Sequence, residues 1–268
     1  MVAAASFRLA AVFFAMFAGL ASAQEKPAST APRAAYEPTS GQEGKDVIWL
    51  PTPQIVVDKM LEIARVGPTD VVMDLGSGDG RTVISAAKLG ARAMGIEYNP
   101  DMVEFARRSA EKAGVAASTS FVKADLFETD FSMASVITMF LLTDINMKLR
   151  PKLLTLKPGT RIVSNTFTMG EWEPETRLSL VGQPGCENSY CTVLYWVVPQ
   201  RVAGTYSTPQ GEVMLKQEFQ MLTGTLGTGT AAVKLQGRVR GEEIELSGGN
   251  KRYRGLLKAG VLELREAG

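Results

Sequence analysis

Two patterns of apolar residues divide the chain near residue 200. Before that point, short apolar runs alternate with segments in which apolar residues recur every three or four positions. The runs are typical of buried strands, and the recurring pattern is typical of amphipathic helices. Beyond it, apolar and polar residues alternate in short stretches between glycine-bearing turns. The chain is therefore expected to hold two domains of different architecture, at 47–199 and 200–268.

Strands and helices are expected to alternate in the first of these domains. The pattern predicts helices over 53–66, 82–89, 102–113 and near 145–154, and strands over 71–75, 93–96, 121–123, 135–140 and 161–164. Strands that are connected through helices at this spacing form a parallel sheet with both faces covered. The predicted fold class is therefore α/β, with a doubly wound sheet.

The second domain, at 200–268, has a period of two. Its clearest stretches are Glu212–Gln217, Ala232–Gln236, Glu242–Leu246 and Arg252–Leu256. This period with regular turns predicts an antiparallel meander, either a small barrel or a half-open sheet. Nothing in its sequence resembles a catalytic constellation. We expect this small β domain either to shield an edge or an apolar face of the first domain, or to bind a partner.

The N-terminus has the pattern of an export signal. Arg8 precedes an apolar stretch, Leu9 to Leu20, and then the small residues Ala21-Ser22-Ala23. Because the stretch is shorter than the roughly 20 residues of a spanning helix, a cleaved signal peptide over 1–23 is preferred to an uncleaved membrane tether. Residues 24–46, rich in Pro, Ala, Ser and Glu, are expected to be a flexible linker. The protein is then expected to be exported to the periplasm, without a permanent membrane span.

Composition excludes several classes of function. The chain has 29 basic and 28 acidic residues, a formal net charge of +1, so no basic field favours a nucleic acid as partner. It has no histidine, which excludes Ser-His-Asp and Cys-His hydrolases. Cys186 and Cys191 are expected to close a hairpin as a disulfide, because no histidine or further cysteine is present to complete a metal site with them.

The most informative motif is VVMDLGSGDG at 71–80, a buried strand followed by three glycines in five positions. Such a turn, here Gly76-Ser77-Gly78, lets backbone N–H groups approach a ligand at the start of a helix. Its G-x-G-x-G spacing differs from the G-x-G-x-x-G spacing that binds a pyrophosphate. Asp74, just before the turn, would repel a phosphate. This carboxylate is expected to hold an ammonium group or to orient the loop.

Two more carboxylates follow the next expected strands. Glu97 lies about 20 residues after the first glycine, the place from which a carboxylate binds the hydroxyls of a ribose. Asp125 is expected to accept a hydrogen bond from the exocyclic amine of adenine. Leu126 would lie against the adenine ring, and Tyr98 would stack on it. A ligand with an amino acid end, a ribose and an adenine but no phosphate is S-adenosylmethionine (SAM).

These motifs resemble those of the class I SAM-dependent methyltransferases. VVMDLGSGDGR, MGIEYNP, KADLF and KPGTRIVS stand in the order and spacing of that family, and the likeness covers roughly residues 47–199. The resemblance implies a mostly parallel seven-stranded sheet, SAM as the cofactor and methyl transfer as the reaction. The small C-terminal β domain is an addition to that fold.

Three further segments, WLPTPQIVVDKML, FLLTDINMKLRPKLL and SNTFTMGEW, are similar to a narrower group. It comprises seven-strand lysine methyltransferases, including the mitochondrial ATP synthase c-subunit enzymes and archaeal protein lysine methyltransferases. The likeness implies that Trp49 and the segment Pro51-Thr52-Pro53 lie over the cofactor. The sequence departs from the group in having Thr143-Asp144 in place of Pro-Ser, and Asn165 where histidine is common.

Methyl transfer depends mainly on positioning and on the exclusion of water. The acceptor-facing residues in this family follow the fourth strand. We expect Phe140 to wall the acceptor channel and Asp144 or Asn146 to orient an amine, although Asp144 is equally suited to cap the next helix. The acceptor is expected to be a protein lysine or a small molecule. The alternative is an exported protein that uses this fold for binding or structure, without turnover.

Overall fold

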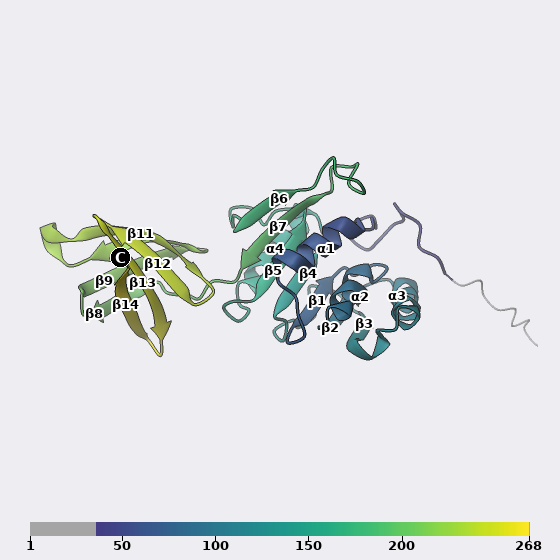
Figure 1. Cartoon of the computed structure of the whole chain (residues 1–268), viewed down its shortest axis with the longest axis horizontal. Helices are drawn as coiled ribbons and strands as arrows, with labels where there is room; N and C mark the ends of the chain where they lie inside the picture. The colour runs from purple at the N-terminus through teal and green to yellow at the C-terminus, as the bar shows by residue number, and fades with distance from the viewer. Residues whose placement is uncertain (1–35, 268) are drawn as a thin grey trace, which may run out of the picture. The chain divides into compact units, whose positions relative to one another are not determined.

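The computed structural model describes residues 36–267. The predicted signal peptide and the first part of the predicted linker lie outside these residues. The described part holds two sheets of seven strands each, the first within residues 71–197 and the second within 204–267 (Figure 1). Each sheet has its own hydrophobic core. The change of pattern near residue 200 therefore coincides with a change of architecture.

The first sheet has the strand order β3-β2-β1-β4-β5-β7-β6. Its strands are β1 Val71–Leu75, β2 Arg92–Glu97, β3 Thr119–Lys123, β4 Val136–Met139, β5 Arg161–Asn165, β6 Thr176–Ser179 and β7 Thr192–Val197. β1 to β5 pair in parallel, whereas β7 pairs antiparallel with both β5 and β6. The predicted α/β class with a mostly parallel seven-stranded sheet is confirmed.

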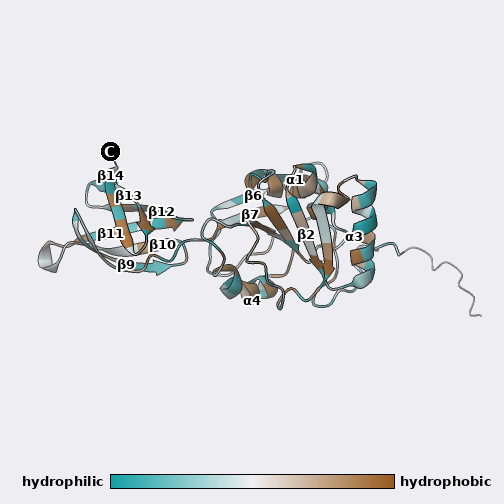
Figure 2. Ribbon diagram, turned by 90° about the horizontal axis from the view of Figure 1, so that it is seen from below, coloured by the Kyte–Doolittle hydropathy of each residue, from teal (hydrophilic) through white to brown (hydrophobic). Residues whose placement is uncertain are grey.

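Four α-helices cover the two faces of this sheet. They are α1 Gln54–Ile63, α2 Arg81–Lys88, α3 Pro100–Lys112 and α4 Thr143–Leu153, and a short 3-10 helix spans Ala116–Ser118. Apolar residues of α1, α2 and α3 pack with Val72 on one face, and those of α4 pack with Met73 on the other. Successive residues of a strand point to opposite faces, so β1 contributes to both layers. Figure 2 shows α1 and α4 on opposite sides of the sheet.

An antiparallel hairpin of β6 and β7 ends the first domain. Cys186 and Cys191 lie in the connection between the two strands and are joined by a disulfide, with their Cα atoms 5.9 Å apart. The predicted disulfide is therefore present in the structure. Both cysteines are fully buried, and the disulfide closes a loop of only four intervening residues.

The second sheet is an antiparallel meander. Its strands are β8 Gly204–Thr208, β9 Gly211–Glu218, β10 Met221–Leu226, β11 Val233–Arg240, β12 Glu243–Gly248, β13 Lys251–Lys258 and β14 Val261–Ala267, with a 3-10 turn at Gly229–Ala231. They pair in chain order, and the two outer strands, β8 and β14, also contact each other. The sheet therefore curls towards a barrel, with alternate residues of its strands in one apolar core, as period two predicts.

Contacts connect this second sheet to the segment before β6. Phe219, in the turn between β9 and β10, stacks on Trp172 with 6.2 Å between ring centroids. The Gln220 side chain donates a hydrogen bond of 2.8 Å to the carbonyl of Glu173, and Arg238 forms an ion pair with Glu175. Phe219 thus packs against the core of the first sheet. Among residues 36–267, no helix has the length and apolar character needed to cross a bilayer.

Candidate functional site

A cavity lies at the carboxyl ends of β1, β2 and β4, where the chain leaves the first sheet. Ten of the sequence-predicted site residues line it: Trp49, Thr52, Asp74, Gly76, Ser77, Glu97, Tyr98, Asp125, Leu126 and Phe140. Parallel strands bring the segments that follow them to the same edge of the sheet, and open α/β sheets bind ligands at that edge. The arrangement explains why residues far apart in sequence meet here.

The glycine turn between β1 and α2 has a backbone that most residues cannot adopt. Gly76, Gly78 and Gly80 have φ angles of 75°, 52° and 81°, in the left-handed region. The N–H groups of Gly76 and Ser77 both donate to the carbonyl of Ile96 at 2.9 Å, which ties the turn to the end of β2. The turn is thus fixed between two strands before any ligand binds.

Gly78 leaves room for an aromatic ring to pack against the turn. It does not line the cavity. A Cβ atom at this position would collide with the indole of Trp49, so the absence of a side chain lets that ring lie directly against the turn. Trp49 itself lines the cavity, as the family resemblance implied.

Asp74 is a buried carboxylate within the cavity wall. Its Oδ1 accepts a hydrogen bond of 2.6 Å from the hydroxyl of Thr138. The pKa of Asp74 is raised to about 7, chiefly by burial and also by the nearby charges of Asp79 and Glu97, while the hydrogen bond from Thr138 opposes the shift. No lysine or arginine within residues 36–267 forms an ion pair with it. A ligand ammonium group would supply the missing positive charge.

The hydroxyl of Ser77 also fits a polar ligand. Its Oγ is buried and has no hydrogen-bond partner among the described residues, and Ser77 lines the cavity. An unpaired buried hydroxyl costs free energy, so a ligand atom that pairs with it gains that energy back.

Glu97 connects the glycine turn to the start of α3. One carboxylate oxygen accepts from the N–H of Gly78 and the other from the N–H of Asn99, both at 2.9 Å. The sequence indicated a ribose-binding carboxylate at this place but gave no sign of these two backbone bonds. Each oxygen keeps a second lone pair, so the carboxylate is held in place and can still accept from two ribose hydroxyls.

Asp125, the third carboxylate, is paired with Lys45. The Lys45 amine lies 2.6 Å from Oδ2 of Asp125 and 5.0 Å from the ring centroid of Tyr98. The N–H of Phe127 donates to Oδ1 at 2.9 Å. These bonds, chiefly that from Lys45, lower the pKa of Asp125 below its ordinary value. Binding of an adenine amine here requires Lys45 to share or leave Asp125.

Residues 36–46, the described part of the expected linker, are mostly exposed but make contacts at the cavity. Gly41 and Trp49 are paired by a backbone hydrogen bond of 2.8 Å, as are Trp49 and Gln42, and residues 42–46 line the cavity. The polar composition of the segment gives no sign of these contacts, because Trp49 and Asp125, to which it bonds, lie outside it. Lys45 was therefore missed as a site residue.

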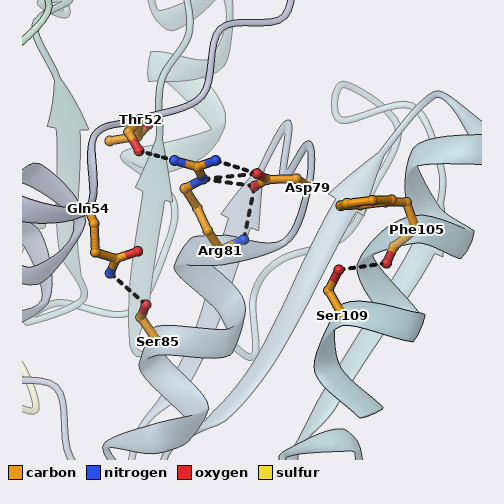
Figure 3. Close-up of polar contacts among 7 residues, drawn as sticks. All are labelled: Thr52, Gln54, Asp79, Arg81, Ser85, Phe105 and Ser109. Carbon is orange, nitrogen blue, oxygen red and sulfur yellow. Dashed lines mark hydrogen bonds and ion pairs between the residues drawn. The ribbon is translucent and has the colours of Figure 1, made fainter. Parts of the chain in front are cut away.

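Arg81 holds the segment before α1 against the glycine turn (Figure 3). Its guanidinium donates to the carbonyl of Thr52 at 2.9 Å and forms a two-pronged ion pair with Asp79, at 2.6 Å between Nη2 and Oδ2. Gln54, two residues further on, donates to the hydroxyl of Ser85 at 3.0 Å. Arg81 is the last residue of the motif VVMDLGSGDGR, and this position directly after the glycine turn is the sequence feature that could have identified it as a site residue.

Of the three residues predicted to face the acceptor, only Phe140 lines the cavity. Asp144 is exposed in the first turn of α4 and does not line the cavity, and Leu142 precedes that helix without any side-chain cap. Asn146 is fully buried, and its amide donates to the carbonyls of Phe167 and Thr168 at 3.0 and 3.2 Å. These bonds position the loop after β5. An amine-orienting role for Asp144 or Asn146 stays a prediction.

Comparison with known proteins identifies relatives of the first domain. The family model described as the ANTKMT methyltransferase domain matches residues 74–176. A protein-lysine N-methyltransferase of Saccharolobus islandicus is 49% identical over 132 residues, which are 48% of this chain and 82% of that protein. The ATP synthase c-subunit lysine N-methyltransferase of Mus musculus is 39% identical over 112 residues, 41% of this chain and 44% of that protein. The chain thus spans about half the length of such animal relatives.

A solved structure shares the same fold. It is the crystal structure described as an RNA methyltransferase from Salinibacter ruber, in complex with S-adenosyl-L-homocysteine (SAH). It is 49% identical to this chain, with a TM-score of 0.53, and the match covers 57% of this chain and 96% of that one. With the archaeal relative, it shows that SAM is the cofactor of this fold and that the chain belongs to the ANTKMT-type family of class I SAM-dependent methyltransferases.

Proposed function

We propose that the protein transfers the methyl group of SAM to the side-chain amine of a protein lysine. The observation that carries the proposal is the 49% identity to a protein-lysine N-methyltransferase over 82% of that relative. The ATP synthase c-subunit lysine N-methyltransferase of Mus musculus, 39% identical over 112 residues, also supports a lysine acceptor. The acceptor protein is unidentified.

Three carboxylates at the cavity are suited to the three parts of the cofactor. SAM supplies an electrophilic methyl group on a sulfonium. Asp74 would hold the ammonium of its methionine part, Glu97 the ribose hydroxyls and Asp125 the adenine amine, with Tyr98 and Leu126 beside the ring. The bare backbone at Gly76 permits close approach, and Trp49 and Thr52 would cover the bound nucleoside.

A lysine acceptor must first lose a proton from its ammonium group, whose ordinary pKa is about 10.4. Removal of water lowers this pKa because it disfavours the charged form. Phe140, Leu141 and Ile145 give the cavity an apolar wall at the end of β4. This wall, and not a histidine, would promote deprotonation of the amine and exclude water from the in-line displacement.

Export to the periplasm is part of the proposal. It is supported by the leader-like sequence at 1–23 and by the disulfide, because disulfides persist in oxidising compartments. N-terminal sequencing of protein recovered from a membrane-depleted fraction tests it. A mature chain that begins at Gln24 supports export with cleavage, whereas an intact Met1 supports an uncleaved tether.

RNA is the second candidate acceptor, because the Salinibacter relative is described as an RNA methyltransferase. The formal net charge of +1 argues against it, since binding to a nucleic acid backbone needs a basic surface. A small-molecule acceptor is the remaining enzymatic alternative. Without turnover, the domain would serve for binding or structure.

Incubation with methyl-labelled SAM and a cell extract separates these functions. The proposal predicts label that is lost on protease treatment, resists ribonuclease and is recovered as methyl-lysine after acid hydrolysis. Label in RNA or in small solutes would overturn it in favour of those acceptors. Absence of label together with SAH binding in calorimetry would favour the binding role, and an Asp74→Ala protein is the matched control for background transfer.

A further inference from the structure

Three aromatic rings lie together beside the cofactor cavity. Phe140 and Phe167 stack with 5.9 Å between centroids and 25° between ring planes. Tyr190 lies 5.9 Å from Phe140 and 6.0 Å from Phe167. The centroids therefore form a nearly equilateral triangle. Only Phe140 of the three also lines the cavity, so the cluster extends from the cavity wall towards solvent.

The position of this aromatic cluster follows from the strand order. Phe140 follows β4, Phe167 follows β5 and Tyr190 precedes β7, and these three strands are neighbours in the sheet. Because β7 runs antiparallel to β5, its first residues lie at the edge where β4 and β5 end. The three carboxylates belong to β1, β2 and the segment after β3. The sheet edge is thus divided between a nucleoside half and an aromatic half.

The backbone around Phe167 is tightly held. Thr166 has a φ angle of 64°, which is unfavourable for a β-branched residue, and its N–H donates to the carbonyl of Thr192 at 2.6 Å. The Phe167 carbonyl accepts from the hydroxyl of Ser164 at 2.8 Å and from the amide of Asn146. Such strained backbone is found at sites where a side chain has to be aimed. Here it aims Phe167 at Phe140.

Tyr190 is placed by the disulfide loop. It is the residue before Cys191, whose bond to Cys186 anchors the loop in the core. Its N–H donates to the side chain of Asn188 at 2.8 Å, which forms a tight turn within the loop. Tyr190 is 38% exposed, so the loop presents a large aromatic side chain to solvent next to two half-buried rings.

We propose that Phe140, Phe167 and Tyr190 form the binding site for the alkylammonium group of the acceptor, and that the Cys186 to Cys191 disulfide positions Tyr190 for it. The inference rests on the proposed lysine acceptor. An ammonium group is attracted to the faces of aromatic rings within about 6 Å of their centroids. One cation above the centre of a triangle with sides near 6 Å satisfies this limit for all three rings.

The cluster also suits the course of the reaction. Cation–π attraction persists when an ammonium carries methyl groups, because it needs no N–H donor. A site built from aromatic rings therefore favours the methylated ammonium that forms on transfer, whereas the attacking amine is neutral and depends on the apolar wall at Phe140 for the loss of its proton. Tyr190 binds the cation directly in this scheme, and Phe140 is the ring of the three that also reaches the cavity.

Binding of a cation probe to the SAH-saturated full chain tests the inference. The probe is N-acetyl-Nε-trimethyllysine amide, and its neutral counterpart is N-acetylnorleucine amide. Calorimetry is expected to show binding of the cation and much weaker binding of the neutral compound. Tyr190→Ala is expected to weaken cation binding about 3-fold to 30-fold, and Tyr190→Phe to preserve it, because the ring and not the hydroxyl makes the contact.

The disulfide is tested with the paired variant Cys186→Ser and Cys191→Ser. This variant is expected to bind the cation probe as weakly as Tyr190→Ala does. The affinity for SAH should be unchanged in both variants, which shows that the proteins are folded. Equal cation affinity in wild type and Tyr190→Ala, or equal binding of the neutral compound, would overturn the inference.

The labelling assay separates this inference from the proposed function. Transfer to lysine with a raised KM and little changed kcat in Tyr190→Ala supports both. Transfer to lysine with an unchanged KM would overturn the aromatic site alone. Label in RNA, with cation binding to the cluster intact, would overturn the lysine function while supporting the cation site.

Discussion

At the residue scale, the ligand-binding chemistry of the cavity depends on three carboxylates that differ in their surroundings. Asp74 is buried and has no cationic partner among the described residues, Glu97 is held by two backbone N–H groups, and Asp125 is paired with Lys45. Their chemistry differs accordingly. Asp74 gains most from a ligand with a positive charge, the Glu97 carboxylate is already fixed in position, and Asp125 binds a ligand only if Lys45 shares or leaves its carboxylate.

The elevated pKa of Asp74 predicts a pH-dependent stability. Its folded pKa is about 7 and the pKa of an unfolded aspartate is about 3.9, so the folded protein binds more protons between these values. The free energy of unfolding of the ligand-free protein should therefore fall as pH rises from about 4 to about 7. Urea denaturation across this range checks it. Asp74→Asn keeps the acceptor for Thr138 and should flatten the profile; identical slopes would contradict the account.

Replacement of Glu97 is expected to reduce the affinity for the cofactor. Glu97→Ala should weaken SAH binding by about 1–3 kcal/mol, the cost of losing hydrogen bonds to a charged group, and should also loosen the turn that Gly78 forms. Isothermal calorimetry measures the change. Glu104→Ala, an exposed glutamate on α3, is the matched control and should bind as wild type does. Unchanged affinity in Glu97→Ala would refute the ribose assignment.

The sequence allowed the three carboxylates to be placed because each lies within, at the end of or just after a strand that the pattern predicts. Lys45 and Arg81 were not predicted as site residues, because a cation in a polar segment cannot be distinguished from a solvated one until its partner in space is known. The contacts of Asn146 were equally hidden, because they are made with the backbone some twenty residues away. The local sequence pattern predicts well where strands end. It predicts poorly which side chains form contacts with one another across the sheet edge.

At the element scale, the segment before α1 is a cover whose position depends on Arg81. Arg81→Met keeps the apolar stem of the side chain but removes the bonds to Thr52 and Asp79. The variant should lose about 1 kcal/mol of stability, and proteolysis of residues 36–53 should become faster. Gln54→Ala, which removes the exposed bond to Ser85, should change stability by less than about 0.5 kcal/mol. Equal proteolysis in both would contradict the bracing role.

Most elements of the first domain could be predicted from the sequence, within a few residues at their ends. The strand over 71–75 is found at the predicted bounds. Neither strand of the hairpin, β6 or β7, was predicted: β6 is an exposed edge strand with little apolar pattern, and β7 was missed although it is buried and apolar. In the second sheet, four alternating stretches were recognised, and β8, β10 and β14 were supplied by the structure.

At the scale of the whole molecule, Phe219 is the aromatic contact of the second sheet with the first domain, beside the polar contacts of Gln220 and Arg238. Its stack on Trp172 predicts that Phe219→Ala costs about 1–3 kcal/mol in the free energy of unfolding while leaving SAH affinity unchanged. Urea denaturation and calorimetry measure the two effects. Such a result favours the structural role for the small β domain. Wild-type stability would favour the partner-binding role instead.

A crystal structure of the SAH complex tests whether the three carboxylates at this sheet edge hold SAM. The ammonium of SAH is expected at Asp74, the ribose hydroxyls at Glu97 and the adenine amine at Asp125, where Lys45 shares or leaves the carboxylate. A nucleoside bound elsewhere, or these three side chains directed into solvent with SAH in place, would contradict this assignment.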